Sequence, residues 1–313
     1  MKILVTGPLG HIGSKLIRHL PEEFPGAHIT LVDNLLTQRY CTLFDLPKTG
    51  TYEFHEIDVA TTDIDGLIER NDVVIHLAAM TDATGSLKHP ELIAKNLDAT
   101  KRVSKSCAKL KKPMLFASST SVYGSQEEIV DETCSIDNLK PQSPYADFKI
   151  QEENHLKAAG TADGLTYMIC RFGTICGVSP GMRFHTAVNK FCYQAVMGQP
   201  ITVWRTAFEQ KRPYLELSDA CRGIAHIIRK KLFNSELYNL VTENTTVRAI
   251  VTDIQKIVPR LQIQYVDSAI MNQLSYNVIA TKFEKTGFEF KGKLSHAIEQ
   301  TVGLLRNANI SIS

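Results

Sequence analysis

The sequence predicts an α/β protein in which a doubly wound parallel sheet is followed by a smaller, mixed C-terminal part. Two observations lead to this prediction. Short apolar, β-branched runs alternate with segments of helical apolar spacing through the first 170 residues, and this rhythm stops near residue 175. Helices cover both faces of a parallel sheet, which explains why the runs are almost wholly apolar. Ligands of such sheets bind beyond the carboxyl ends of the strands, so a site is expected just after each run.

The expected strands are short apolar runs, of which the third is more polar: Ile3–Thr6, His28–Val32, Thr51–Glu56, Val73–Leu77, Met114–Ala117 and Leu165–Arg171. The expected helices carry apolar residues three and four positions apart: Ile12–Leu20, Ile64–Arg70, Leu92–Leu110 and Ala146–Ala159. After residue 175, Pro and Gly interrupt short elements, and Glu236–Asn239 resembles a late return to the sheet. We therefore expect one domain over 1–173, rejoined by 217–241, and a second over 174–216 and 242–313.

The composition is that of an ordinary globular protein, with 35 Lys plus Arg, 33 Asp plus Glu and 43% hydrophobic residues. A net charge of +2 gives no electrostatic reason to expect nucleic acid or an anionic membrane as a partner. The seven cysteines form no CxxC pair, so no metal site is predicted, and scattered thiols suit a reducing compartment. The apolar run Ile3–Val5 is too short for a signal peptide, and no later stretch is long enough to span a membrane. We expect a cytoplasmic protein.

A glycine-rich segment, TGPLGHIG at Thr6–Gly13, joins the first strand to the first helix. Gly7 permits a tight turn, Gly10 lets the backbone approach a pyrophosphate, and Gly13 allows the helix to pack closely on the strand. The first N–H groups of the helix then attract the phosphates. This pattern predicts a Rossmann-type dinucleotide site. Its predicted contacts are Gly7, Gly10, His11, Ile12 and Gly13.

An acidic residue, Asp33, ends the second strand twenty residues after Gly13. A carboxylate at this place accepts hydrogen bonds from the adenosine ribose and repels a 2′-phosphate, which favours NAD over NADP. The adjacent Asn34 would suit a turn, and Asp58 with Val59, after the third strand, would fit an adenine contact. The first domain is therefore predicted to bind NAD.

Tyr145 and Lys149 are four residues apart and share one face of a predicted helix. An ammonium group close to a phenol stabilises the phenolate, which makes the tyrosine a usable proton acceptor. The hydroxyl-rich segment Ser118–Gly124 follows the fifth strand, where its side chains could bind a substrate oxygen. Each pattern alone also occurs on solvated helices and in ordinary turns. Their combination with the glycine motif and Asp33 is what indicates an enzyme.

In combination these motifs resemble the extended short-chain dehydrogenase/reductase family, in particular its nucleotide-sugar epimerases and dehydratases. The resemblance runs through most of the chain. It rests on TGxxGxxG, VDN at Val32–Asn34, HLAA at His76–Ala79, His89-Pro90 followed by Asn96, SSTSVYG, Tyr145xxxLys149, Arg171-Phe172-Gly173, and RPYLELSD at Arg212–Asp219.

The resemblance implies a role for each matching position. Ser119 would polarise the substrate, Tyr145 would be the catalytic base, and Lys149 would assist it and hold the nicotinamide ribose. The implied cofactor lining adds Leu77, Ala78, Ala79 and Asn96, and the implied substrate contacts are Thr120, Ser121, Thr174, Arg183, Asn189 and Arg212. The family often has Asn where this chain has Thr174, and the segment holding Arg183 and Asn189 could equally be a structural loop and helix start.

The implied first step is oxidation of a sugar hydroxyl at C4 by NAD. Similar 4,6-dehydratases carry a carboxylate pair or Ser-Glu at positions 120 and 121, and decarboxylating relatives carry Glu at 121, whereas this chain has Thr120 and Ser121. We therefore expect a nucleotide-sugar 4-epimerase acting on a nucleoside-diphosphate sugar. A 4-dehydrogenase or 4-ketoreductase is the alternative, and a 4,6-dehydratase or a non-catalytic NAD-binding regulator is disfavoured. The resemblance also implies a homodimer formed through Leu92–Leu110 and Ala146–Ala159.

Overall fold

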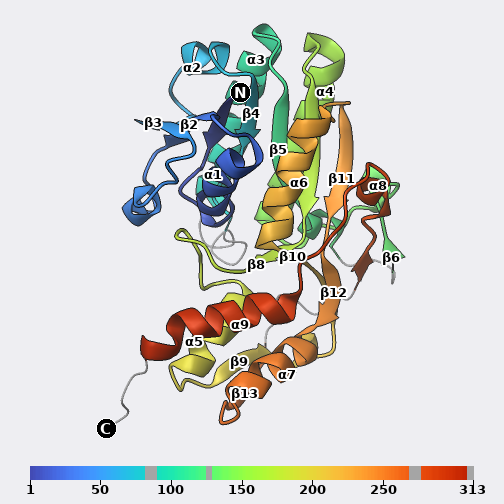
Figure 1. Ribbon diagram of the computed structural model, residues 1–313. Coiled ribbons are helices and arrows are strands. Elements are labelled where there is room, and N and C mark those ends of the chain that lie inside the picture. Colours follow the sequence, from blue (N-terminus) through green and yellow to red (C-terminus); the bar gives the residue numbers. More distant parts are fainter. Residues whose placement is uncertain (82–89, 125–128, 268–275, 309–313) are drawn as a thin grey trace.

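A computed structural model describes residues 1–81, 90–124, 129–267 and 276–308 of the chain. Its main feature is a seven-stranded sheet of order β11-β7-β5-β4-β1-β2-β3, in which all neighbours run parallel (Figure 1). The strands are β1 (Lys2–Thr6), β2 (His28–Asp33), β3 (Thr51–Glu56), β4 (Val73–His76), β5 (Met114–Ser119), β7 (Tyr167–Phe172) and β11 (Glu236–Leu240). The strand order reverses between β1 and β4, so the predicted Rossmann-type doubly wound fold is confirmed.

Helices cover both faces of this sheet, as the sequence predicted. They are α1 (His11–Glu23), α2 (Asp65–Glu69), α3 (Pro90–Lys109), α4 (Pro144–Asp163) and α6 (Leu217–Lys230). Side chains of α1 and α6 share one apolar core with the sheet, and side chains of α2, α3 and α4 share a second core on the opposite face. In Figure 1, α1 and α6 stand in front of the sheet and α3 and α4 behind it.

The C-terminal part has a mixed sheet of β12-β10-β8, with β8 (Thr174–Cys176) parallel and β12 (Glu243–Thr246) antiparallel to β10 (Lys211–Glu216). It also contains the parallel pair β9 (Ile201–Trp204) and β13 (Ile263–Val266), with α5 (Ala187–Val196), α7 (Val247–Ile257) and α9 (Leu294–Leu305). The three helices share an apolar core with β8, β9, β10 and β13, below the large sheet in Figure 1. The predicted smaller mixed part is thereby confirmed.

Two strand pairings connect the N-terminal and C-terminal parts of the chain. Strand β6 (Ile129–Val130) pairs in parallel with β14 (Asn277–Val278), which is followed by the one-turn helix α8 (Thr281–Glu284). Strand β11 joins the edge of the large sheet beside β7 after the chain has already passed through α5 and β10. In the part of the chain that the structure describes, no helix is long and apolar enough to cross a membrane.

Candidate active site

A cavity of about 850 Å³ lies at the carboxyl ends of the parallel strands, between the large sheet and the C-terminal part. Most of the sequence-predicted site residues line it: Gly7, Gly10, His11, Ile12, Gly13, Asp33, Asn34, Asp58, Val59, Leu77, Ala78, Ala79, Asn96, Ser119, Thr120, Ser121, Tyr145, Lys149, Thr174, Arg183 and Arg212. Asn189 does not reach the cavity, and His89 lies outside the described residues. The strand ends thus bring together groups that are far apart in sequence, as expected of this fold.

The turn after β1 is shaped so that two of its glycines cannot be replaced without strain. Gly7 has φ +69°, and a Cβ there would lie 2.7 Å from the Ala78 nitrogen. A Cβ on Gly13 would lie 2.4 Å from the Gly7 carbonyl oxygen. Gly10 caps the 13-residue helix α1 and offers no side chain to its first N–H groups. Those donors face the cavity uncapped, which fits the pyrophosphate of a dinucleotide.

Asp33 ends β2 and is held by the backbone. Its Oδ1 accepts a hydrogen bond from the Leu35 N–H at 3.0 Å, and its Oδ2 accepts one from the Leu9 N–H at 3.3 Å. Burial raises the pKa of Asp33, although these N–H groups and the nearby Arg39 act in the opposite direction. The carboxylate is therefore fixed at the rim of the cavity, where it fits the hydroxyls of an adenosine ribose.

His11, the first residue of α1, bonds to the protein itself. Its Nε2 lies 2.8 Å from the carbonyl oxygen of Gly177, which follows β8. Burial lowers the pKa of His11 to about 4, so the neutral ring donates this hydrogen bond. The Ser179 hydroxyl also donates to the His11 carbonyl at 2.9 Å, and the Gly181 N–H donates to Ser14 Oγ at 2.9 Å. These three contacts anchor the C-terminal part to the glycine-rich turn and the start of α1.

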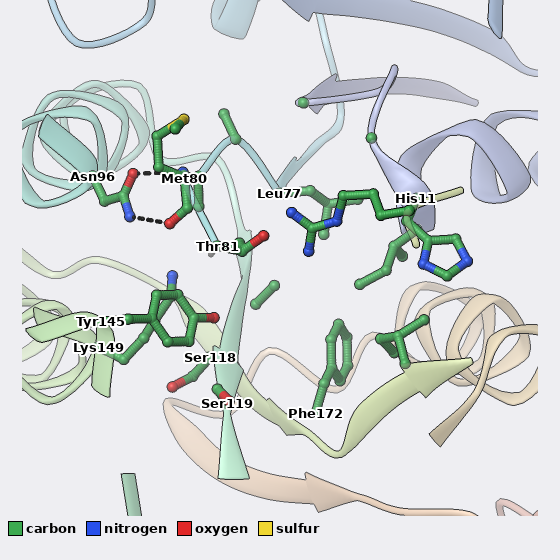
Figure 2. Close-up of a pocket in the computed structure, with 18 of the residues that line it drawn as sticks. His11, Leu77, Met80, Thr81, Asn96, Ser118, Ser119, Tyr145, Lys149 and Phe172 are labelled. Carbon is green, nitrogen blue, oxygen red and sulfur yellow. Dashed lines mark hydrogen bonds between the residues drawn. The ribbon is translucent and has the colours of Figure 1, made fainter. Parts of the chain in front are cut away.

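Tyr145 and Lys149 lie in the first two turns of α4, and their position follows from how this helix starts. The Ser143 hydroxyl caps it by accepting from the Ala146 N–H at 3.3 Å, and Pro144 occupies the first turn. The Lys149 Nζ lies 5.9 Å from the centre of the Tyr145 ring. Figure 2 shows both side chains on the same side of the cavity as Ser118 and Ser119, with His11 and Leu77 on the other side.

Ser119 ends β5 and begins a short 3₁₀ turn, Thr120–Tyr123. Its hydroxyl accepts the Ser121 N–H at 3.2 Å, which leaves its own proton available for a substrate oxygen. The turn closes at Gly124, where φ is +64° and a Cβ would overlap the Lys140 carbonyl. The Ser119 hydroxyl, the Tyr145 phenol and the Lys149 ammonium therefore line one cavity. This combination can accept a proton from a substrate hydroxyl.

Two buried carboxylates support this group from α4. Glu152 Oε2 lies 3.0 Å from Lys149 Nζ, with both side chains at most 2% exposed. Burial alone would lower the pKa of Lys149, but Glu152, Tyr145 and Glu153 together outweigh burial and raise the pKa, with Glu152 the largest of the three. Glu153 instead accepts two hydrogen bonds from Arg171, at 2.9 and 2.6 Å, and one from the Ser118 hydroxyl at 2.6 Å. It fixes the strand residue that precedes Ser119.

Two of the sequence-predicted contacts have hydrogen-bond partners within the protein. Asn96 Oδ1 accepts from the Met80 N–H at 2.8 Å, and its Nδ2 donates to the Met80 carbonyl at 2.9 Å, so its amide shapes the segment after β4 (Figure 2). Asn189 is fully buried, donates to the Arg183 carbonyl at 2.9 Å and accepts the Gly177 N–H at 3.4 Å. Its predicted substrate contact is not supported by this geometry, because both ends of its amide already bond to backbone. It positions Arg183, which does line the cavity.

The two residues after Ser119 differ in how they are used. The Thr120 hydroxyl donates to the Phe172 carbonyl at 3.2 Å, so it secures β5 to β7. The Ser121 hydroxyl is buried at the cavity wall with no hydrogen-bond partner among the described residues. A buried hydroxyl without a partner is costly, so a substrate oxygen would satisfy it.

Sequence reasoning missed several lining residues, including Arg39, Gln142 and Tyr276. The Tyr276 hydroxyl donates to the Thr120 carbonyl at 3.1 Å from more than 150 residues away, and no local pattern signals such a contact. Glu152 was also missed, although its spacing of three residues from Lys149 puts both on one helix face. Trp204 lines the cavity, whereas its neighbour Arg205 is exposed and lies against Asp267.

The uncapped glycine turn, the carboxylate that ends β2 and the serine–tyrosine–lysine group define a class: an NAD-dependent enzyme of the extended short-chain dehydrogenase/reductase type. The sequence matches the NAD dependent epimerase/dehydratase family over residues 3–240, and the chain therefore belongs to this family. NAD is its cofactor, and the first residues of α1 together with Asp33 would hold it.

Two curated relatives match most of the chain. The uncharacterized UDP-glucose epimerase YtcB of Bacillus subtilis is 30% identical over 268 residues, covering 82% of each chain. A UDP-N-acetyl-alpha-D-glucosaminuronate decarboxylase of Bacillus cytotoxicus is 28% identical over 265 residues, covering 82% of this chain and 80% of the relative. Among solved structures, a UDP-glucuronic acid 4-epimerase from Bacillus cereus superposes with a TM-score of 0.86 at 23% identity, covering 98% of this chain and all of the other. This last likeness shows a shared fold.

Proposed function

We propose that the protein is a nucleotide-sugar 4-epimerase, which inverts C4 of a nucleoside-diphosphate sugar by removing and returning one hydride. UDP-sugars are the first substrates to test, because the names of the relatives specify them. The family alone leaves open epimerisation, decarboxylation and dehydration, since relatives of all three kinds match the chain. The choice therefore depends on the groups around the reacting carbon.

The observation that carries the proposal is the placement of acidic groups. Among the described residues that line the cavity, the only carboxylates are Asp33 and Asp58. Asp33 ends β2 and Asp58 follows β3, whereas Ser119 ends β5. Three or four strand spacings of about 4.8 Å therefore separate the carboxylates from Ser119, or roughly 14–19 Å. Around Ser119 the wall carries hydroxyls. Elimination across C5 and C6 requires a positioned acid or base there, and removal and return of a hydride at C4 does not.

The residues of the cavity can support the removal and return of a hydride at C4. NAD, when bound, supplies the hydride acceptor and donor. Tyr145 accepts the proton of the C4 hydroxyl, Ser119 donates a hydrogen bond to the same oxygen, and Lys149 stabilises the phenolate. The ketone then presents its other face, and Tyr145 returns the proton as the hydride comes back. We propose that Ser121, Thr174, Arg183 and Arg212 hold the sugar nucleotide during this turn.

The test is incubation of the purified protein with NAD and UDP-glucose, UDP-N-acetylglucosamine or UDP-glucuronate, followed by NMR of the C4 configuration. One of these substrates should reach an equilibrium of two C4 epimers with no net NADH. Tyr145→Phe should lower kcat by about 10²–10⁴-fold while NAD binding persists. Tyr265→Phe, a change at an exposed tyrosine of β13, is the matched control. Accumulation of NADH and ketone without an epimer would identify a dehydrogenase instead.

Three broader expectations are part of the same proposal. We propose that α3 and α4, which pack against each other, also form the interface of a homodimer, which light scattering would detect as twice the mass of 34.9 kDa. A monomer at micromolar concentration would contradict this. We also propose that the protein works in the cytoplasm. Residues 1–173 and 217–241 would bind NAD, and 174–216 and 242–313 would select the sugar.

A further inference from the structure

Glu152 is a buried acidic residue that the chemistry of Ser119, Tyr145 and Lys149 does not require. It is 1% exposed, lies one helical turn after Lys149, and its Oε2 is 3.0 Å from the Lys149 Nζ. Taking a carboxylate and an ammonium out of water is costly, so their pairing inside the active site calls for an explanation. The neighbouring Glu153 has one already, because Arg171 binds it at both oxygens.

A chain of hydrogen bonds fixes the other oxygen of Glu152. The Thr100 hydroxyl donates to Glu152 Oε1 at 2.6 Å and lies 3.2 Å from His76 Nε2. His76 Nδ1 lies 2.7 Å from the Thr6 hydroxyl, which accepts the Ala78 N–H at 3.2 Å. Burial lowers the pKa of His76 to about 3, so its ring is neutral and carries one proton.

The donor and acceptor of each hydrogen bond in this series follow from the groups at its two ends. A carboxylate only accepts, so Thr100 donates to it and must accept from the Nε2–H of His76. The His76 Nδ1 then accepts from the Thr6 hydroxyl. Every polar group from Thr6 to Glu152 Oε1 then has a hydrogen-bond partner, and Glu152 Oε2 faces Lys149 as an ion pair. The carboxylate is thereby held against Lys149 by contacts that extend from α4 through α3 and β4 to β1.

The charged and polar groups around the Lys149 ammonium come from four elements. They are Tyr145, Glu152 and Glu153 on α4, neutral His76 on β4, Thr100 on α3, and the Phe116 ring on β5 at 4.5 Å. Because Arg171 neutralises Glu153, Glu152 is the carboxylate that balances Lys149 among these described neighbours. Tyr145 therefore faces a neutral pair instead of an isolated cation.

We propose that Glu152 is a positioning residue that keeps Lys149 in place as an ammonium and sets the pH at which Tyr145 exchanges its proton. This inference rests on the proposed role of Tyr145 as the proton acceptor. An unbalanced ammonium would stabilise the phenolate more strongly and let it form at lower pH. The same ammonium, buried without its carboxylate, would also lose its own proton at lower pH.

The test replaces the charge and keeps the shape, with Glu152→Gln. Tyrosinate absorbance is titrated in the NAD-loaded protein, and the signal of Tyr145 among the ten tyrosines is isolated by subtracting a Tyr145→Phe titration in the same background. The midpoint should move to lower pH by about 1–3 pH units, the range for one close charge, because Lys149 still loses its proton only above this midpoint. A midpoint that moves to higher pH would overturn the inference. Both limbs of the pH–rate profile should move in the same direction. An unmoved midpoint with activity reduced equally at all pH values would overturn the inference.

Glu153→Gln is the matched control, because it removes an adjacent buried carboxylate that Arg171 already neutralises. It should move the midpoint less than Glu152→Gln, and an equal shift would contradict the assignment. If Glu152→Gln does not fold, NMR of Lys149 in the wild-type protein decides instead. Lys149 should stay charged through the pH range in which Tyr145 ionises, and loss of its proton below that range would also overturn the inference. Neither titration needs turnover, so a failure of C4 epimerisation would leave both interpretable.

Discussion

Replacing His11 by Gln should make the protein less sensitive to acid. A Gln amide can still donate to the Gly177 carbonyl, but it cannot take up a proton at mild pH. In the wild type, burial lowers the pKa of His11 from 6.5 to about 4. The unfolded chain therefore binds more protons than the folded protein between these two values, so stability is complete above 6.5 and falls as the pH falls toward 4.

The size of the effect follows from the same two values. The gap from 6.5 to about 4 corresponds to roughly 3.4 kcal/mol, at about 1.36 kcal/mol per pKa unit. At pH 5, where the transition is incomplete, about 2 kcal/mol of it should already be lost. His76 loses stability in the same pH range, because burial lowers its pKa to about 3, but it does so equally in both proteins and cancels in the comparison.

The assay is urea unfolding of wild type and His11→Gln at pH 7.5 and pH 5, with the free energy of unfolding extrapolated to water. The wild type should lose about 2 kcal/mol more than the variant between these pH values. His296→Gln, at a histidine whose side chain is 65% exposed, is the matched control and should follow the wild type. Equal losses in wild type and His11→Gln would refute the assignment of a buried, neutral His11 as the anchor between α1 and Gly177.

Three further substitutions test other parts of the site. Gly13→Ala places a Cβ 2.4 Å from the Gly7 carbonyl oxygen, an overpacking that costs about 1–3 kcal/mol. NAD binding, measured by calorimetry, should therefore weaken roughly 10- to 100-fold. Unchanged affinity would contradict the geometry of the turn. Asp33→Asn should shift the NAD-over-NADP preference toward NADP by roughly 10- to 100-fold. An unchanged ratio of the NAD and NADP dissociation constants would show that Asp33 does not contact the adenosine ribose. Arg171→Leu strands the Glu153 carboxylate and should lower the free energy of unfolding by about 3–5 kcal/mol. Most of that loss should return in the double variant with Glu153→Leu, and no recovery would show that the pair itself is not responsible.

The large sheet was predictable because most of its strands are self-contained signals; the more polar edge strand β3 is the exception. Runs such as Val73–Leu77 and Met114–Ala117 are buried on both faces, so their apolar character does not depend on distant partners. The small C-terminal sheet lacks such a signal. Strand β8 has three residues and β12 reads ENTT, and both are strands only because β10 lies between them. Their pairing with β10 joins residues up to 40 positions apart, which no local pattern shows.

The candidate site was predictable where a residue's role depends on its place at the end of a strand. Asp33 and Ser119 are such cases, and both line the cavity. Sequence patterns do not show a hydrogen-bond partner that is distant in the sequence. Asn189 has the chemistry of a substrate contact, yet its amide is used by the backbone at Gly177 and Arg183. His11 lines the cavity but donates to a carbonyl 166 residues away. Only the folded structure shows which polar groups can still form hydrogen bonds with a ligand.

Helix α4 shows that the buried positive and negative charges of this site are equal in number. Its buried face carries Lys149, Glu152 and Glu153, where an ordinary helix would carry apolar residues. With Arg171 from β7, the two cations match the two carboxylates, so the interior has no net charge before the reaction begins. Ionisation of Tyr145 adds one negative charge to this neutral group, and Lys149 is the cation that lies beside it. Under the proposed mechanism, these buried charges provide an environment in which Tyr145 exchanges one proton at a defined pH. Removal of any one of the four should then alter that pH or the fold.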